Sequence, residues 1–228
     1  MNSFLKIGHR GAKGYEPENT LVSFEKALEM NADGIELDVH TCKSGELIVI
    51  HDFTVDRTTN GKGAVSDLTL SELKALRINA TFQVPTLEEV LTLFTKNHLI
   101  NIELKGTNTA QKVCECISKW VKENRLLYQN FIVSSFEEQL IAQVAEINAK
   151  IPLGILTQTS MEQALEWANR YAAKAIHPHF SLLTPENVAL TRKKGYQIFT
   201  WTVNEPVDIE RVKDLGVNGI ITDYLDRI

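Results

Sequence analysis

Two carboxylates alternate along one short apolar run of this sequence. In Gly34-Ile-Glu-Leu-Asp-Val39 the period of two predicts a strand with Glu36 and Asp38 on one face and apolar side chains on the other. Glu103, near the end of a later predicted strand, can add a third carboxylate. Acids that share a buried face repel one another and lose hydration unless a cation or a shared proton lies between them. We therefore predict a site for one divalent cation, Mg²⁺ or Ca²⁺, since both prefer oxygen ligands; a solvated acidic strand face is the alternative.

Two histidines stand at the ends of predicted extended runs. His9 ends the first predicted strand, and His51 directly follows the run 46–50. An imidazole titrates near neutral pH, so two of them can act as general acid and general base on opposite sides of a reacting phosphorus atom. Arg10 can bind phosphate oxygens through its planar fork, and Lys105 can add a point charge. A single histidine at a strand end is more often structural, so this hypothesis rests on the joint arrangement of these residues.

Other polar residues nearby are candidates for holding these groups in place. Glu16, Asn19 and Asp52 could orient a metal ligand or a histidine, as such sites generally require. Asn19 followed by Thr20 is equally typical of a plain helix start.

Short apolar runs alternate with helical patterns along nearly the whole chain. We predict strands at Leu5–Gly8, Gly34–Thr41, Leu99–Leu104, Asn130–Ser134, Ile151–Ile155, Ala175–His177, Gln197–Trp201 and Gly219–Thr222. Apolar spacings of three and four predict helices at Asn19–Met30, Thr86–Lys96, Thr109–Glu123, Glu137–Ala149, Ser160–Arg170, Pro185–Lys194 and Glu205–Leu215. This alternation indicates parallel strands joined by helical crossovers. Eight such strands predict an α/β fold, a TIM (β/α)8 barrel, with an open doubly wound sheet as the alternative.

The candidate residues share one place in this predicted fold, because barrel enzymes have their active sites where the strands end. The residues at or just beyond predicted strand ends are His9, Glu36, Asp38, Glu103, Lys105, Trp201 and Asp223. We interpret residues 1–228 as a single domain with a small insertion at 52–85, after the second strand and over the barrel mouth. No outer helix is predicted after the last strand.

The composition narrows the partners and the location of the protein. The chain has 228 residues, a net charge of −5 and a pI near 5.7, and its lysines and arginines are scattered. Proteins that bind nucleic acid usually carry a basic stripe, so we expect no nucleic-acid partner and a small-molecule substrate. The sequence shows no signal-peptide pattern and no apolar stretch of about 18 residues, so no membrane insertion is expected. An odd count of three cysteines is no disulfide framework, and we expect a cytoplasmic protein.

Several segments together resemble the glycerophosphodiester phosphodiesterase family, and the match runs from end to end. They are His9-Arg-Gly11, Pro17-Glu-Asn-Thr20, Glu36-Leu-Asp38, His51-Asp52, Arg57-Thr-Thr-Asn-Gly61, Pro85-Thr-Leu-Glu-Glu89, Asn101-Ile-Glu-Leu-Lys105, Thr200-Trp-Thr-Val-Asn204 and Thr222-Asp223. Each alone is a weak signal, whereas their joint order and spacing are specific. The resemblance implies a barrel with an inserted segment after the second strand. It also implies hydrolysis of a small-molecule glycerophosphodiester to sn-glycerol 3-phosphate and an alcohol.

The resemblance further implies a role for each candidate residue. The positions matching Glu36, Asp38 and Glu103 would bind a divalent cation. The histidines matching His9 and His51 would be the catalytic acid–base pair, although neither residue pattern nor resemblance tells which one is the acid.

Three further positions complete the implied site and leave alternatives open. Arg10 and Lys105 would bind the phosphate, and Trp201 would line the site against the alcohol. One alternative is a lysophospholipid or sphingolipid phosphodiesterase of the same layout. The others are a non-catalytic phosphodiester-binding barrel and an unrelated hydrolase that uses an acid pair. The preferred head group stays open, and we expect a monomer or a homodimer.

Overall fold

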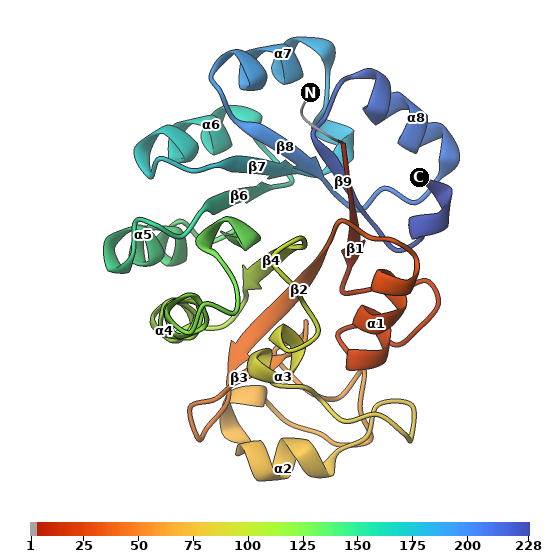
Figure 1. Cartoon of the computed structure of the whole chain (residues 1–228), viewed down its shortest axis with the longest axis vertical. Coiled ribbons are helices and arrows are strands. Elements are labelled where there is room, and N and C mark those ends of the chain that lie inside the picture. Colours follow the sequence, from red (N-terminus) through yellow and green to blue (C-terminus); the bar gives the residue numbers. More distant parts are fainter. Residues whose placement is uncertain (1–3) are drawn as a thin grey trace.

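Eight parallel strands form a closed barrel in the computed structural model, which describes residues 4–228 (Figure 1). They are β1 (Leu5–His9), β2 (Gly34–Thr41), β4 (Leu99–Leu104), β5 (Phe131–Ser135), β6 (Leu153–Thr157), β7 (Ala175–Pro178), β8 (Gln197–Thr200) and β9 (Gly219–Thr222). The barrel closes at β1, which pairs with β2 on one side and with β9 on the other. The predicted TIM (β/α)8 barrel is confirmed, and the open doubly wound sheet is wrong.

Helices lie outside the barrel wall and follow the strands in sequence (Figure 1). They are α1 (Leu21–Glu29), α3 (Leu87–Leu91), α4 (Thr109–Lys122), α5 (Glu138–Ile147), α6 (Met161–Arg170), α7 (Pro185–Lys193) and α8 (Pro206–Asp214). Local capping starts several of them: the hydroxyl of Thr20 accepts from the N–H of Ser23, and that of Thr184 accepts from the N–H of Asn187. The main apolar core lies between these helices and the strands.

Helix α3 is shorter than the predicted helix Thr86–Lys96. It ends at Leu91, although the apolar spacing continues to Phe94, which is buried in the core. The hydroxyl of Thr92 bonds back to the carbonyl of Glu89, and the next residues turn toward His98. Threonine side chains compete in this way with the helical hydrogen bonds of the backbone, and the helix stops.

After β2 the chain leaves the barrel. Strand β3 (Leu47–Val49) pairs antiparallel with β2, and helix α2 (Leu70–Ala75) follows after a 3₁₀ turn at Val65–Asp67. This segment has an apolar cluster of its own, formed by Cys42, Ile48, Ile50, Val55, Val65, Leu73, Ile78 and Val84. It is therefore a small packed unit attached to the side of the barrel, with α2 at the outer edge in Figure 1.

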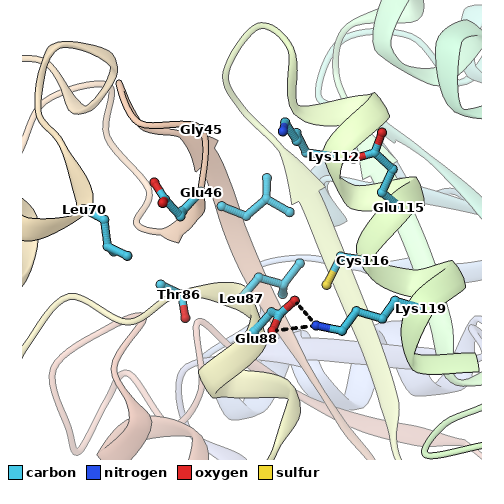
Figure 2. A pocket seen from close by; sticks show the side chains of 11 residues that line it. Gly45, Glu46, Leu70, Thr86, Leu87, Glu88, Lys112, Glu115, Cys116 and Lys119 are labelled. Carbon is cyan, nitrogen blue, oxygen red and sulfur yellow. Dashed lines mark hydrogen bonds and ion pairs between the residues drawn. The ribbon is translucent and has the colours of Figure 1, made fainter. Parts of the chain in front are cut away.

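A surface groove separates this unit from α4. It has a volume of about 410 Å³ and is lined by residues of β3, α2, α3 and α4 together with Gly45, Glu46 and Thr86. Figure 2 shows Lys119 reaching across to Glu88, whose carboxylate oxygens lie 2.8 and 3.1 Å from its Nζ. None of the residues predicted to do chemistry lines this groove, so the site must be sought at the barrel mouth.

Three further findings bear on the sequence-based expectations. Within residues 4–228, β9 is followed only by a 3₁₀ turn, Leu225–Arg227, as expected from the absence of a last helical pattern. The three cysteines are buried and unpaired. No helix of the described part of the chain combines the length and the apolar character needed to cross a bilayer.

One histidine is enclosed in the barrel. His177 on β7 is fully buried, and neither of its ring nitrogens has a hydrogen-bond partner among the described residues. Gly154 on β6 makes room for the ring, because a Cβ there would lie 2.7 Å from Nε2. Burial lowers the pKa of His177 to about 3, so the ring stays neutral in the folded protein near neutral pH.

Replacing His177 with leucine should make the free energy of unfolding less sensitive to acid. The folded state holds the pKa of His177 at about 3, whereas an unfolded histidine titrates near 6.5. The wild type therefore loses stability as the pH falls below 6.5, by about 1.4 kcal/mol per pH unit until the folded pKa is reached. Urea unfolding at pH 7 and pH 5 should show a loss that is about 2 kcal/mol larger in the wild type than in His177→Leu. Equal losses would contradict this assignment.

Candidate active site

The three carboxylates predicted to bind a cation meet where the middle of β2 lies beside the C-terminal end of β4. Glu36 and Asp38 lie on β2, and the strand register places Asp38 beside Glu103 of β4. One oxygen from each carboxylate lies within 4.8 Å of the others, and all three residues are buried. The barrel therefore presents three oxygen ligands to one small space.

Burial makes Glu36 and Glu103 costly to keep charged. It raises the pKa of Glu36 well above the usual value, and the charges of Asp38 and Glu103 raise it further. Burial and then the charge of Asp38 raise the pKa of Glu103 to about 7. A positive charge among the three would relieve this repulsion, and hard divalent cations prefer oxygen ligands. The residues therefore fit the predicted cation, and an ion could be held here.

Arg10 is brought to the carboxylates by a tight turn after β1. Its φ is 51° and that of Gly11 is 86°, so both residues adopt the left-handed conformation. Glycine is required at position 11, because a Cβ there would lie 2.4 Å from the hydroxyl oxygen of Ser23. The N–H of Arg10 donates to Oε2 of Glu36 at 3.0 Å, and its Nε lies 3.3 Å from Oδ2 of Asp38.

Lys105, just beyond β4, is a second cation at the same place. Its Nζ donates to Oε1 of Glu103 at 2.9 Å and lies 3.9 Å from Oδ1 of Asp38. Burial lowers the pKa of Lys105, but the charges of Glu103 and Asp38 outweigh this effect and leave the pKa raised. The charged ammonium can only donate, so Nε2 of His51, at 3.2 Å, accepts from it.

His51 reaches the mouth because β3 pairs with β2. The N–H of Ile50 donates to the carbonyl of Asp38 at 3.1 Å, and Nε2 of His40 donates to the carbonyl of His51 at 3.1 Å. Nδ1 of His51 donates to Oδ1 of Asp52 at 2.7 Å. Burial lowers the pKa of His51 despite the nearby acids, so the neutral ring keeps its lone pair on Nε2.

His9, like His51, is oriented by a carboxylate that accepts from its Nδ1. Its Nδ1 donates to Oδ1 of Asp223, at the end of β9, over 2.7 Å. The side chain of Asn204 holds this carboxylate, with Nδ2 2.8 Å from Oδ2 of Asp223 and Oδ1 accepting from the N–H of Asp223 at 2.9 Å. Burial lowers the pKa of His9, although the hydrogen bond to Asp223 opposes this. Each histidine therefore has a carboxylate on Nδ1 and its lone pair on Nε2, which in His51 accepts from Lys105.

These groups line one cavity of about 110 Å³ at the barrel mouth. The cavity is lined by His9, Arg10, Glu36, His51, Asn101, Glu103, Lys105, Phe136, Leu156, Trp201, Thr202 and Ile221. Every residue predicted for the site is in this lining except Asp38, which lies behind it and is 1% exposed. Trp201 is fixed by donation from its Nε1 to the carbonyl of His177 at 2.7 Å, and its ring forms a T-shaped pair with that of Phe136.

The surrounding residues were only partly anticipated. Asn19 donates to Oδ2 of Asp38 at 2.9 Å and Asp52 holds His51, whereas Glu16 forms no side-chain hydrogen bond within residues 4–228. Sequence reasoning missed Glu18, whose Oε1 accepts from Nη1 of Arg10 at 2.8 Å, and the support that Asn204 gives to Asp223. Both lie inside segments that carry the family resemblance, which is the one signal that could have found them.

Comparison with known proteins agrees with this geometry. A model of the glycerophosphoryl diester phosphodiesterase family matches residues 9–227. A glycerophosphodiester phosphodiesterase of Caldanaerobacter subterraneus is 40% identical, with 96% of this chain and 93% of the relative covered. Another, of Bacillus subtilis, is 36% identical, with 97% and 84% covered. The crystal structure of a glycerophosphodiester phosphodiesterase of Thermotoga maritima superposes with a TM-score of 0.83 at 31% identity, covering 98% of this chain and 96% of that one. The chain belongs to the glycerophosphoryl diester phosphodiesterase family.

Proposed function

We propose that this protein hydrolyses glycerophosphodiesters to sn-glycerol 3-phosphate and an alcohol, using one divalent cation, Mg²⁺ or Ca²⁺. The observation that carries the proposal is the charge balance at the mouth. When all three carboxylates are ionised, Glu36, Asp38 and Glu103 face two cations, Arg10 and Lys105, which leaves one negative charge. A divalent cation would reverse it to one positive charge, which matches the single negative charge of a phosphodiester.

The cation would be held by the three carboxylates. When bound, it would polarise the phosphoryl group and neutralise charge that develops there. Arg10 and Lys105 would bind the phosphate oxygens, and such preorganised charge is commonly the largest catalytic contribution. Both side chains line the cavity, so they can reach a phosphate without a change in the fold.

The two histidines would move the protons. One Nε2 removes a proton from the attacking oxygen, and the other histidine, protonated, gives a proton to the oxygen of the departing alcohol. The attacking oxygen is either that of water or the adjacent hydroxyl of the glycerol, which gives a cyclic phosphate that water then opens. Both routes consume one water in total. The carboxylates of Asp223 and Asp52 keep His9 and His51 in the tautomer that has its lone pair on Nε2.

The remaining parts of the proposal concern the substrate and the whole chain. Trp201 lines the cavity against the alcohol, and the small cavity favours a small-molecule glycerophosphodiester. We place the protein in the cytoplasm as a monomer or homodimer with neither nucleic acid nor membrane insertion. Residues 1–228 form one domain in which 52–85 is an insertion.

Removal of either histidine should lower kcat by about 10²–10⁴-fold, because one proton transfer is lost. The variants are His9→Ala and His51→Ala, with circular dichroism to show that the fold persists. His98→Ala is the matched control, since His98 precedes β4 at the end opposite to Glu103. Near-normal turnover in both site variants would refute the assignment.

Cation affinity should rise with pH between pH 6 and pH 8. The pKa of Glu103 is raised to about 7, so at pH 6 a cation must displace the proton of Glu103, whereas at pH 8 this carboxylate is already largely ionised. Calorimetric titration with Mg²⁺ and Ca²⁺ in buffers of different ionisation enthalpy should detect proton release at the lower pH. Glu103→Gln should weaken binding and reduce this release. Binding that is independent of pH would contradict the shared site.

Chelation should abolish the release of glycerol 3-phosphate from glycerophosphocholine. EDTA removes the cation that the three carboxylates would hold, and excess Mg²⁺ or Ca²⁺ should restore activity. The same assay with lysophosphatidylcholine tests the alternative of a lipid phosphodiesterase, which predicts faster turnover of that substrate. If no glycerophosphodiester gives EDTA-sensitive release, the barrel is a binding module.

A further inference from the structure

Arg57 lies outside the cavity, on the segment that follows β3, and its guanidinium holds two carboxylates at once. Nε and Nη2 donate to the two oxygens of Asp52 at 2.6 and 3.0 Å. Nη1 and Nη2 donate to the two oxygens of Glu18 at 3.0 and 2.7 Å. The planar fork of an arginine can make such paired bonds, whereas the ammonium of a lysine cannot.

Each of these two carboxylates also accepts a hydrogen bond from a residue of the proposed site. Asp52 accepts from Nδ1 of His51, and Glu18 accepts from Nη1 of Arg10. Arg57 therefore links His51, the proposed proton-transfer residue after β3, to Arg10, the proposed phosphate-binding residue after β1. Arg57 itself is not part of the cavity lining.

The link depends on the positive charge of Arg57. Its Nη2 touches both carboxylates, so Asp52 and Glu18 lie close together and would repel each other without it. The side chain of Glu18 is 12% exposed and that of Asp52 is 27% exposed, so water screens this repulsion only in part. The hydrogen bonds from Arg57 and Arg10 outweigh burial and lower the pKa of Glu18 to about 2.

The inserted segment fixes the backbone beneath Arg57. Val55 is fully buried in the apolar cluster of that segment, and its N–H donates to the carbonyl of Gly63 at 3.0 Å. The N–H of Thr59 donates to the carbonyl of Val55 at 3.0 Å and closes a turn around Arg57. The guanidinium is thus held by a packed unit and not by a free loop.

We propose that Arg57 is a positioning residue, through which the inserted segment sets the orientation of both His51 and Arg10. This rests on the proposed function, because the two residues it positions are those assigned to proton transfer and phosphate binding. Loss of Arg57 should lower kcat through His51 and raise KM through Arg10. A residue that supports only folding would change neither constant in the folded fraction.

The test compares Arg57→Ala and Arg57→Lys with Arg170→Ala, using glycerophosphocholine and saturating Mg²⁺ or Ca²⁺. Arg170 is a matched control: its side chain is 50% exposed, against 49% for Arg57, and it also pairs with two carboxylates, those of Glu138 and Glu166. We expect kcat/KM to fall about 10–100-fold in both Arg57 variants, as is usual when a supporting partner is removed, and to be unchanged in Arg170→Ala. Guanidinium ion at a non-denaturing concentration should restore part of the lost activity in Arg57→Ala, because it can occupy the vacated space between Asp52 and Glu18.

A proton NMR signal gives a readout that does not depend on turnover. The Nδ1 proton of His51, in its short bond to Asp52, should resonate far downfield and vanish in His51→Ala. We expect it to broaden or shift in Arg57→Ala, to recover with guanidinium ion and to persist in Arg170→Ala. Wild-type kcat, KM and NMR signal in Arg57→Lys would overturn the proposal, even if the alanine variant fails to fold. A loss without guanidinium rescue and in proportion to unfolding would also overturn it. An inactive wild type with the expected NMR changes would refute the proposed function and leave the positioning role standing.

Discussion

Three buried carboxylates in one small space are the constraint on which the barrel mouth depends. Keeping Glu103 charged where its pKa is about 7 costs about 3 kcal/mol relative to an exposed glutamate at neutral pH. The turn at Arg10 offsets part of this cost, because its left-handed backbone directs both an N–H and a guanidinium toward the carboxylates. Lys105 and Asn19 donate further hydrogen bonds to these carboxylates from other parts of the chain. The mouth is therefore a cluster of donors arranged around a fixed negative centre.

Near these carboxylates, each of the two histidines is oriented by a hydrogen bond to an aspartate, and each aspartate is held by a different kind of side chain. Each donates from Nδ1 to a carboxylate, which fixes the tautomer. The carboxylate of Asp223 accepts from the amide of Asn204 and has Nζ of Lys13 3.9 Å away, whereas that of Asp52 accepts directly from the guanidinium of Arg57. Asn204 follows β8 and Arg57 follows β3, so the two halves of the mouth are built from different parts of the chain.

The sequence predicted the strands and the clustered residues well, because a period of two and a strand end are local properties. Local patterns could not predict that Asp38 lies beside Glu103, since this depends on the register between strands far apart in the chain. They overestimated the length of α3, because the apolar spacing of Leu91 and Phe94 continues past the residue at which the hydrogen bond of Thr92 ends the helix. The contact of Glu18 with Arg57 joins two irregular loops 39 residues apart and has no periodic signature.

The bond between His9 and Asp223 joins residues 214 positions apart, across the seam where β1 meets β9. During synthesis from the N-terminus, the chain carries the acidic triad and both histidines long before it carries the aspartate that orients one of them. That pair can form only after β9 has been synthesised and can pair with β1. A chain that is unfinished, or cut before its final strand, therefore holds nearly every chemical group of the site and still lacks one oriented imidazole. Completion of the fold and completion of the proposed proton-transfer apparatus are one event.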